Sequence, residues 1–256
     1  MEKRTPEFYK EQKKKILVIG DNQDILNAIA RLASEYNSED IDIEYACSPS
    51  ESGQQLSIEN QPVAELDIKQ NVNNIIEQEY SVILSAHCKQ IFPQELVDRV
   101  RCVNIHPGYN PYNRGMFPHV FSIINGLPAG ATLHEMNSEI DSGDIIDQVQ
   151  VRVEPTDTSE SLYNRVLDEE KRLLGQYLAR IITGEYRPVP TNAEGNLNRK
   201  KDYEALKKID TESTGTFMEH INQLRALSHG GYKNAYYIDR DTGKKIWIRV
   251  VLEEEA

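Results

Sequence analysis

An apolar run between charged residues, KKKILVIGD at residues 13–21, most limits what this chain can fold into. A strand without polar alternation is typical of a parallel sheet that is covered on both faces. The next segment, NQDILNAIARLASEY at residues 22–36, has apolar residues at helical spacing. A buried strand followed by an amphipathic helix predicts the start of a doubly wound α/β sheet.

The same alternation continues over about the first 110 residues. We expect further strands at 41–47, 81–87 and 100–107 and a helix in VNNIIEQ, at 72–78. The last of these strands ends in Asn-Ile-His-Pro, and ligands in open α/β sheets bind at the carboxyl ends of strands. The segment NIHPGYNPYNRGMFP then holds three prolines and two glycines, which predicts a long ordered loop.

Beyond the loop, the pattern predicts a short helix at 119–126, strands at 130–137 and 144–153, and a long helix at 158–183 that begins at Thr156 or Thr158. Turn-rich sequence after residue 184 indicates a domain boundary near residue 190. We therefore predict a Rossmann-like α/β domain over 1–190, with residues 1–12 as a leader. A small α+β subdomain over 191–256 follows, with a helix in FMEHINQLRAL and a final hairpin around RDTG.

The composition excludes several classes of protein. The formal net charge of -12 disfavours broad nucleic-acid binding, which needs a basic face, although a local basic pocket is compatible with it. No stretch is apolar enough to cross a membrane, and the N-terminus has no apolar signal core. Cys47, Cys88 and Cys102 form neither a metal-ligand spacing nor an even disulfide set, so we expect a protein of the reducing cytoplasm.

Asn104, His106 and Asp141 are the candidate catalytic residues. Asn104 and His106 are two apart at a strand end, so their side chains point to the same face. Asn104 can donate a hydrogen bond to the oxyanion that forms when an amine attacks an acyl carbon, and His106 can donate to it or accept a proton. Asp141, in the turn before a strand, could orient the imidazole and raise its pKa. The spacing alone equally allows Asp141 to be a turn carboxylate that bonds its own backbone.

The wider segment NIHPGYNPYNRGMFPHVFSIINGLPAGATLHEMNSEIDSGDII resembles the signature region of the folate-dependent formyltransferases. That family has Asn-x-His-Pro, Arg-Gly-x-x-Pro, Thr-x-His and Asp-x-Gly-Asp-Ile-Ile in this order, and SAHCKQIFP resembles its cofactor segment. The resemblance covers about residues 13–155. It implies a formyltransferase-type Rossmann-like domain, Asn104, His106 and Asp141 as catalytic residues, and N10-formyltetrahydrofolate as the cofactor.

The resemblance also implies where the ligands bind. The pterin is expected mainly on backbone groups of two segments, represented by Ala86, His87, Cys88, Lys89, Gln90, Ile91, Ser138 and Asp144. The loop residues Tyr112, Arg114, Gly115, Met116 and Phe117 are candidates for the acceptor, although loop shaping is an equal alternative.

The carboxy-terminal tail narrows the choice of amine that accepts the formyl group. Residues 195–203 and 225–253 look like the carboxy-terminal region of the dTDP-4-amino-4,6-dideoxyglucose formyltransferases of surface-polysaccharide (O-antigen) pathways. We therefore expect a dTDP-linked amino sugar as partner and no nucleic acid or membrane; the resembled family also implies a homodimer. A 3-amino sugar, methionyl-tRNA or a non-catalytic folate or nucleotide sensor remain alternatives.

Several tail residues are candidates for the nucleotide. The cations would come from Arg199, Lys200, Lys201, Arg225 and Lys233, and Tyr232 or Tyr236 would stack on the base. Solvated lysines and tyrosines that pack a sheet face are the alternative. His119 and His134 could join His106 at a metal, but no cysteine or carboxylate spacing accompanies them, so we predict no metal site.

Overall fold

The computed structural model describes residues 13–36, 40–50, 55–191 and 193–255, so the expected leader, residues 1–12, lies outside the described residues. The main sheet has the strand order β10-β9-β7-β6-β1-β2-β5. Its strands are β1 Lys14–Gly20, β2 Ile41–Cys47, β5 Ala64–Glu65, β6 Val82–Ala86, β7 Cys102–His106, β9 Ala129–Glu135 and β10 Ile145–Val151. β5, β2, β1, β6 and β7 are parallel, and β9 is antiparallel to β7. The predicted α/β class is confirmed.

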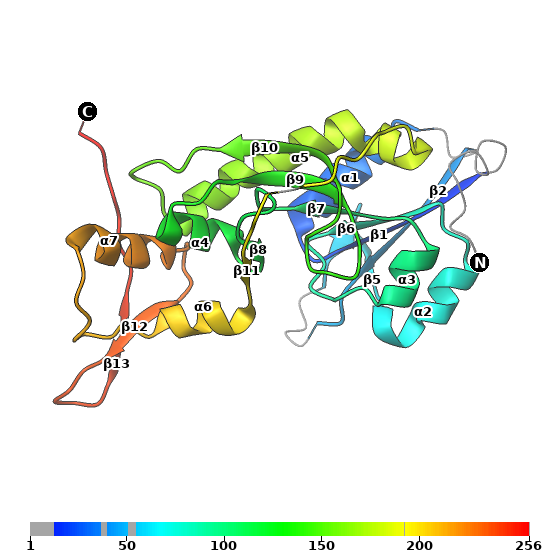
Figure 1. The fold of residues 1–256 in the computed structure, drawn as a ribbon. Coiled ribbons are helices and arrows are strands. Elements are labelled where there is room, and N and C mark those ends of the chain that lie inside the picture. Colours follow the sequence, from blue (N-terminus) through cyan, green and yellow to red (C-terminus); the bar gives the residue numbers. More distant parts are fainter. Residues whose placement is uncertain (1–12, 37–39, 51–54, 192, 256) are drawn as a thin grey trace. The chain divides into compact units, whose positions relative to one another are not determined.

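Helices cover both faces of this sheet (Figure 1). α2 Ile68–Glu77 and α3 Gln94–Arg99 lie on one face, where Ile75 and Leu96 join a buried cluster with Leu17 and Ile83. α1 Gln23–Ala33 and α5 Ser159–Thr183 lie on the other. The arrangement leaves the carboxyl ends of β1, β6 and β7 at one edge, where the candidate catalytic residues lie.

Local sequence explains where the helices begin. The Asn22 side chain accepts a hydrogen bond from Ile25 N at 3.0 Å and so caps α1. Asp67 caps α2 in the same way through Gln70 N, which places the start of that helix four residues before the predicted one. Thr158 directly precedes α5, and its Oγ1 accepts from Ser161 N at 3.4 Å, as the capping pattern predicted. α3 was not predicted because six residues are too few to show a helical period.

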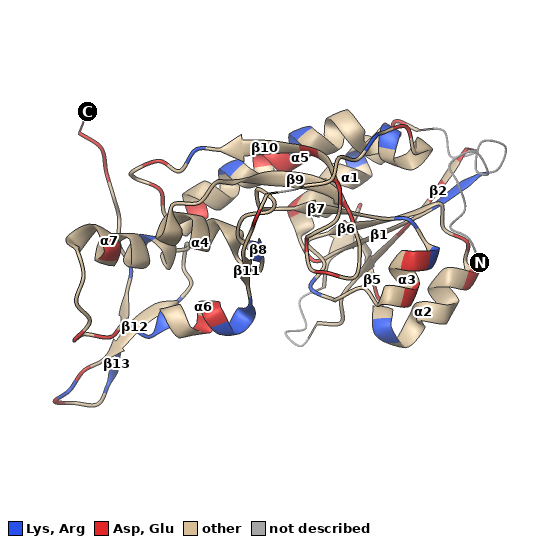
Figure 2. Cartoon of the chain, in the orientation of Figure 1, with Lys and Arg blue, Asp and Glu red and all other residues tan. Residues whose placement is uncertain are grey.

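The remaining elements are short. They comprise β3 Ser57–Ile58, β4 Gln61–Pro62, β8 Arg114–Gly115, α4 Pro118–Asn125, β11 Leu197–Asn198, α6 Lys200–Lys207, α7 Phe217–Ala226, β12 Ala235–Ile238 and β13 Lys245–Ile248. β12 and β13 form the predicted antiparallel hairpin, and α7 is the predicted tail helix. α6 was not predicted, and it contains both acidic and basic residues, as does α3 (Figure 2).

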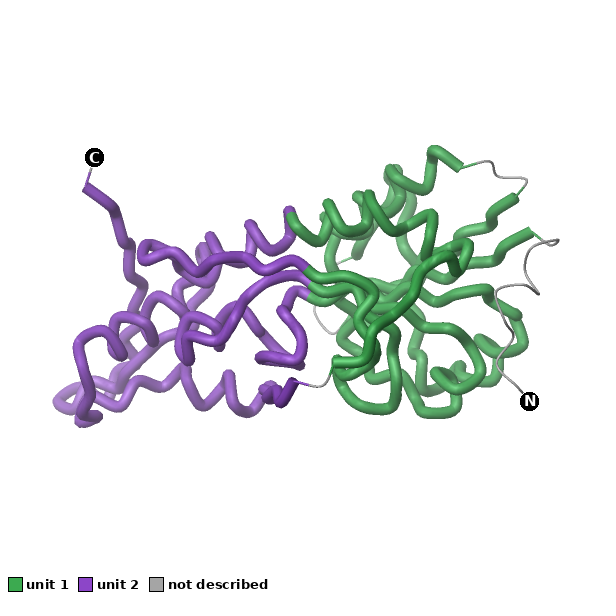
Figure 3. Tube along the Cα trace, turned by 45° about the horizontal axis from the view of Figure 1, so that its top comes forward, with its two compact units in different colours: residues 1–106, 132–148, 169–192 green, residues 107–131, 149–168, 193–256 purple. Residues whose placement is uncertain are grey.

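The chain divides into two compact units that are not contiguous in sequence (Figure 3). Unit 1 contains residues 1–106, 132–148 and 169–192, and unit 2 contains 107–131, 149–168 and 193–256. β9, β10 and α5 each contribute residues to both units. A single boundary near residue 190 therefore does not describe this division, because the long loop after β7 groups with the tail.

Candidate active site

β7 presents two polar side chains on one face at its carboxyl end. Asn104 and His106 alternate with Val103 and Ile105, and both are buried. On the neighbouring strand β9, His134 is the register partner of Asn104. The strand register therefore places an amide and two imidazoles within a small part of unit 1.

Asp141 reaches this cluster from the loop between β9 and β10. Its Oδ1 accepts a hydrogen bond from Asn104 Nδ2 at 3.2 Å, and its Oδ2 lies 3.5 Å from His106 Nδ1. Asp141 has φ +48, a strained backbone conformation for a residue with a side chain. Two residues later, a Cβ on Gly143 would lie 1.8 Å from the Glu135 carbonyl oxygen. The glycine of the DSGD turn thus lets the Asp141 loop pack directly against β9.

His134 is a fourth member of the cluster. Its Nδ1 lies 2.7 Å from the Glu135 carbonyl oxygen, so Nδ1 carries the proton and Nε2 is an acceptor. Asn104 Nδ2 lies 3.2 Å from this Nε2, so both N–H bonds of Asn104 are used, by His134 and by Asp141. The sequence pattern connects His134 only with a possible metal; its Thr-x-His motif and its register with Asn104 are the features that indicate its place in this cluster.

Burial controls the charge of His106. Removal from water lowers its pKa to about 4; the Asp141 charge raises it, and His134 and His87 lower it. Asp141 raises the pKa of His106 as expected, but the effect of burial is larger and the net shift is downward. Because a carboxylate faces Nδ1, that nitrogen carries the proton of the neutral ring. The buried Nε2 has no hydrogen-bond partner among the described residues, so its lone pair is available to a reactant.

The expected cofactor segment follows β6, and several of its polar groups bond other parts of the protein. Lys89 N donates to Asp21 Oδ2 at 2.7 Å. The Gln90 amide bonds Ser48 Oγ, the Leu66 carbonyl and Ile68 N. Burial raises the pKa of Cys88 to about 11, so it is no reactive thiolate.

Ile91 is an apolar residue of this segment that is 71% exposed. Ala86 is buried at the end of β6, and His87 bonds a glutamate of α5. Ser138 and Asp144 have exposed side chains, and the Asp144 carbonyl accepts from Glu135 N at 2.9 Å. Backbone groups and one apolar side chain are therefore what this segment can offer a ligand.

In unit 2, the loop after β7 pairs with the tail. β8 is parallel to β11, and a Cβ on Gly115, at φ +88, would lie 2.4 Å from the Asn198 carbonyl oxygen. The Phe117 ring packs on Tyr203 with ring centroids 4.0 Å apart. Tyr112, Arg114 and Met116 are half-buried in the same loop, and Lys200 and Lys201 are exposed at the start of α6. The predicted loop candidates and the first tail lysines thus lie in one region.

Asn113 holds that loop in place. Its backbone has φ +52 and its side chain is fully buried. Asn113 Oδ1 accepts from the amides of Asn125, Asn196 and Asn198 at 2.7 to 3.2 Å, and its Nδ2 donates to Ser122 Oγ at 3.0 Å. This hub joins the loop to α4 and β11.

The structure argues against a nucleotide-binding role for Arg225. It is 8% exposed, and Nη1 donates to the carbonyls of Glu154, Pro155 and Asp157 while Nε donates to Asn222 Oδ1. The guanidinium is thus used to close the turn before α5. Arg199, Lys233 and Tyr232 are exposed, whereas Tyr236 packs against Trp247 across the hairpin with ring centroids 5.2 Å apart.

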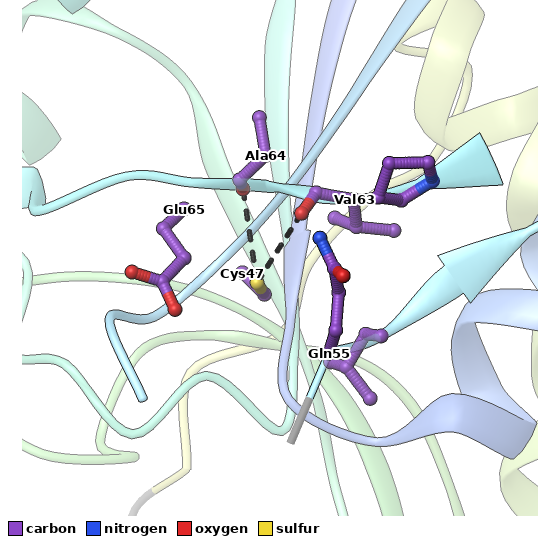
Figure 4. Close-up of a pocket in the computed structure, with 7 residues that line it drawn as sticks. Cys47, Gln55, Val63, Ala64 and Glu65 are labelled. Carbon is purple, nitrogen blue, oxygen red and sulfur yellow. Dashed lines mark hydrogen bonds between the residues drawn. The ribbon is translucent and has the colours of Figure 1, made fainter. Parts of the chain in front are cut away.

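A cavity of about 440 Å³ lies elsewhere in unit 1 (Figure 4). Cys47, Gln55, Ala64 and Glu65 line it, and the Cys47 thiol bonds the Ala64 carbonyl at 3.7 Å. Burial raises the pKa of this thiol as well. The residues that line this cavity do not include Asn104, His106 or Asp141.

Over the described ranges, no group of three or more His, Cys, Asp or Glu side chains is arranged to hold a metal ion. No helix in that same part of the chain is long and apolar enough to span a bilayer. The three cysteines are free thiols.

Comparison with known proteins agrees with the motif-based resemblance. A family model described as formyl transferase matches residues 10–178, and one described as N-formyltransferase dimerization C-terminal domain matches residues 202–254. A dTDP-4-amino-4,6-dideoxyglucose formyltransferase of Mycobacterium bovis is 47% identical over 193 residues, which are 75% of this chain and 82% of that protein.

Solved structures give the same result. A 4-N formyltransferase from Francisella tularensis is 41% identical with a TM-score of 0.88, over 95% of this chain and 99% of that one. The formyltransferase PseJ from Anoxybacillus kamchatkensis, in complex with UDP-4,6-dideoxy-4-formamido-L-AltNAc and tetrahydrofolate, is 25% identical with a TM-score of 0.57, over 75% of this chain and 88% of that one. The resemblance drawn from the sequence motifs is confirmed.

Proposed function

The chain belongs to the formyl transferase family, and we propose that it transfers the formyl group of N10-formyltetrahydrofolate to the amino group of a dTDP-linked 4-amino-4,6-dideoxyhexose. The acceptor that we propose is dTDP-4-amino-4,6-dideoxy-D-glucose, and the product would serve O-antigen or other surface-polysaccharide synthesis. The choice of acceptor is supported by the relative that is 47% identical, and one observation carries the catalytic part of the proposal: the buried His106 has its Nδ1 facing Asp141 and its Nε2 unpartnered among the described residues. This is the arrangement of a general base.

Each residue of the cluster has a role in this reaction. When bound, the folate supplies the formyl group. His106 Nε2 accepts the proton that the attacking amine loses, and this proton balances the one taken up by the departing folate nitrogen. Asp141 keeps the His106 proton on Nδ1 and stabilises the imidazolium that forms.

Asn104 would donate a hydrogen bond from Nδ2–H to the formyl oxygen as negative charge develops on it. This bond would lower the activation free energy by about 2–4 kcal/mol. Both N–H bonds of Asn104 are used in this structure, so one of them must be exchanged when the substrates bind. The bond to His134 is the one to exchange, because it is the contact to a neutral acceptor whereas Asp141 is charged.

The folate fits the residues after β6. The Gln90 amide and the Lys89 backbone N–H are used in bonds within the protein, and the Lys89 side chain is exposed. Other backbone groups of the segment would hold the hydrogen-bonding edge of a pterin. Ile91, which is exposed, would contact the pterin ring on one side, and Ser138 and Asp144 would lie on the other side of the ring. The tyrosine, arginine and lysines around β8 and the start of α6 would hold the dTDP sugar, with Lys200 and Lys201 nearest to a diphosphate.

We further propose that the enzyme is a homodimer in the cytoplasm. Ile246 and Trp247 of the final hairpin are part of the segment matched by the dimerization model, and both are exposed for apolar residues. A second copy of the hairpin would remove them from water.

The proposal is tested by mass spectrometry of reaction products. The protein is incubated with N10-formyltetrahydrofolate and a panel of dTDP sugars with a 3- or 4-amino group in the gluco or galacto configuration. We expect formylation of the 4-amino gluco sugar, and a fall in turnover of at least about tenfold in Asn104→Ala and His106→Asn without unfolding. If no sugar is formylated and methionyl-tRNA is, the proposed acceptor is wrong. Near-normal turnover in both variants would refute the catalytic assignment.

A further inference from the structure

A carboxylate at the end of β1 joins the ends of three neighbouring strands. Asp21 directly follows β1, which lies between β6 and β2 in the sheet. Its Oδ1 accepts a hydrogen bond from Ser48 N at 2.8 Å, and its Oδ2 accepts from Ser48 Oγ and from Lys89 N, both at 2.7 Å. Ser48 is the first residue after β2, and Lys89 is the third residue after β6. One side chain on the middle strand therefore holds the chain that leaves both of its neighbours.

A glutamine extends this arrangement to the start of α2. Ser48 Oγ, which donates its hydrogen to Asp21, accepts from Gln90 Nε2 at 3.1 Å. Gln90 Nε2 also donates to the Leu66 carbonyl at 2.8 Å, and Gln90 Oε1 accepts from Ile68 N at 2.8 Å. Asp21, Ser48 and Gln90 are all half-buried, so these bonds are partly shielded from water. We call these three residues the Asp21 network.

The Asp21 network takes the place of regular backbone bonds in the loop after β6. Residues 88–91 lie outside helix and strand, and none of them makes a backbone–backbone hydrogen bond to another described residue. A loop without such bonds opens and rearranges at low cost unless other contacts hold it. The bonds from Lys89 N and from the Gln90 side chain are contacts of this kind. They select one conformation of the loop.

The conformation of this loop matters because residues 88–91 belong to the segment that we expect to hold the folate by its backbone. A ligand that bonds several backbone groups needs all of them in place at once, and their geometry is set by the residues behind them. Lys89 N is used by Asp21, so it is not among the groups that the pterin would bond. Asp21 therefore acts on the ligand through the loop.

We propose that Asp21 is a positioning residue for the folate: by holding Ser48 and Lys89, it fixes the backbone of residues 88–91 in the conformation that binds the pterin. This deepens the proposed function and rests on it, because it takes this segment as the pterin site. The bonds to Asp21 are present without a ligand, so binding does not have to order the loop. Asp21 should therefore determine the affinity for the folate and not the rate of the reaction at saturation.

The direct test measures the Kd of 5-formyltetrahydrofolate, a stable isomer of the formyl donor, by calorimetry without a sugar. In Asp21→Asn, one carboxylate oxygen becomes an NH₂ group, which must face a donor of Ser48 or Lys89. Two facing donors cannot bond and the loop is displaced, so we expect the Kd to rise about tenfold. The matched control is Asp24→Asn, which removes the same charge from an exposed position in the first turn of α1 and should leave the Kd unchanged.

Steady-state kinetics separate positioning from a general structural role. In Asp21→Asn, the KM for N10-formyltetrahydrofolate should rise about tenfold, while kcat and the KM for the dTDP sugar stay within about twofold of the parent values. A structural role alone would lower kcat through loss of folded protein and leave both KM values unchanged. Ser48→Ala removes one hydroxyl but keeps the backbone N–H that bonds Asp21, so the Kd for 5-formyltetrahydrofolate should rise less, by about threefold.

Two results would overturn the proposal. One is a folded Asp21→Asn protein whose Kd equals that of the parent, and the other is a fall in its kcat with an unchanged Kd. If Asp21→Asn does not fold, Ser48→Ala decides in its place, and an unchanged Kd there has the same meaning. The binding measurement uses no sugar, so failure to find the acceptor leaves it intact. Equal folate binding by parent and variants would reject the role of Asp21 while the formyl transfer itself still stands.

Discussion

Replacing Gly143 by alanine should disable the active site while leaving the fold largely intact. The added Cβ would lie 1.8 Å from the Glu135 carbonyl oxygen and 2.7 Å from the Glu135 carbonyl carbon. Both atoms belong to the backbone of β9, so no side-chain rotation relieves the overlap. A normal carbon–oxygen contact is about 3.3 Å, so the loop must retreat by about 1.5 Å.

The retreat reaches the reactive groups because Asp141 is two residues before Gly143. It separates Asp141 from His106 Nδ1, now 3.5 Å away, and breaks the bond from Glu135 N to the Asp144 carbonyl. A misplacement of about 1 Å costs about 100-fold in rate, so we expect kcat/KM to fall by at least about 100-fold. The lost backbone bond should lower the free energy of unfolding by only about 1 kcal/mol.

The assay compares formylation of the dTDP sugar with urea unfolding in the same preparations. Gly175→Ala is the matched control: it lies in α5, and a Cβ there meets nothing within 4 Å. That variant should keep full activity and gain about 0.5–1 kcal/mol of stability. A Gly143→Ala protein with the kcat/KM of the parent would show that the loop geometry does not position Asp141 for the reaction.

Three further predictions concern His106, Asn113 and Ile246. Because the pKa of His106 falls from 6.5 to about 4 on folding, the unfolded chain binds more protons between these pH values, and the free energy of unfolding rises with pH through this window. From pH 5 to 7, urea titrations should show that the parent gains about 2 kcal/mol more than His106→Asn. Equal gains in the two proteins would contradict a buried neutral ring. Asn113→Ala leaves three amides without their acceptor and should lower the free energy of unfolding by about 3 kcal/mol; a loss below about 1 kcal/mol would show that the hub is dispensable. Ile246→Asp should convert the proposed dimer to a monomer in analytical ultracentrifugation, and a dimer that persists would place the interface elsewhere.

The sequence was informative where local pattern decides the structure. The apolar runs of β1, β6 and β7 have the length and flanks of parallel strands, and the two-residue spacing of Asn104 and His106 fixes their common face. The small elements β5, β8 and β11 were missed because two residues show no periodicity and are held as strands by their partners.

Side-chain environments were harder to predict because they depend on distant partners. Glu170 lies 83 residues after His87, so neither residue's sequence context indicates the hydrogen bond between them. The net direction of the His106 pKa depends on complete burial, which the strand pattern alone does not quantify. Arg225 looked like a free cation because the carbonyls that it contacts are 68 to 71 residues earlier.

The Asn113 hub also has a consequence for synthesis of the protein on the ribosome. Two of its hydrogen-bond partners, Asn196 and Asn198, are 83 and 85 residues further along the chain. At about 5–20 residues per second, the ribosome needs about 4–17 s to add that length. During this interval the side-chain oxygen of Asn113 lacks two of its three permanent hydrogen-bond donors. Translation speed between residues 113 and 198 is therefore expected to influence how much of the nascent chain a chaperone must shield.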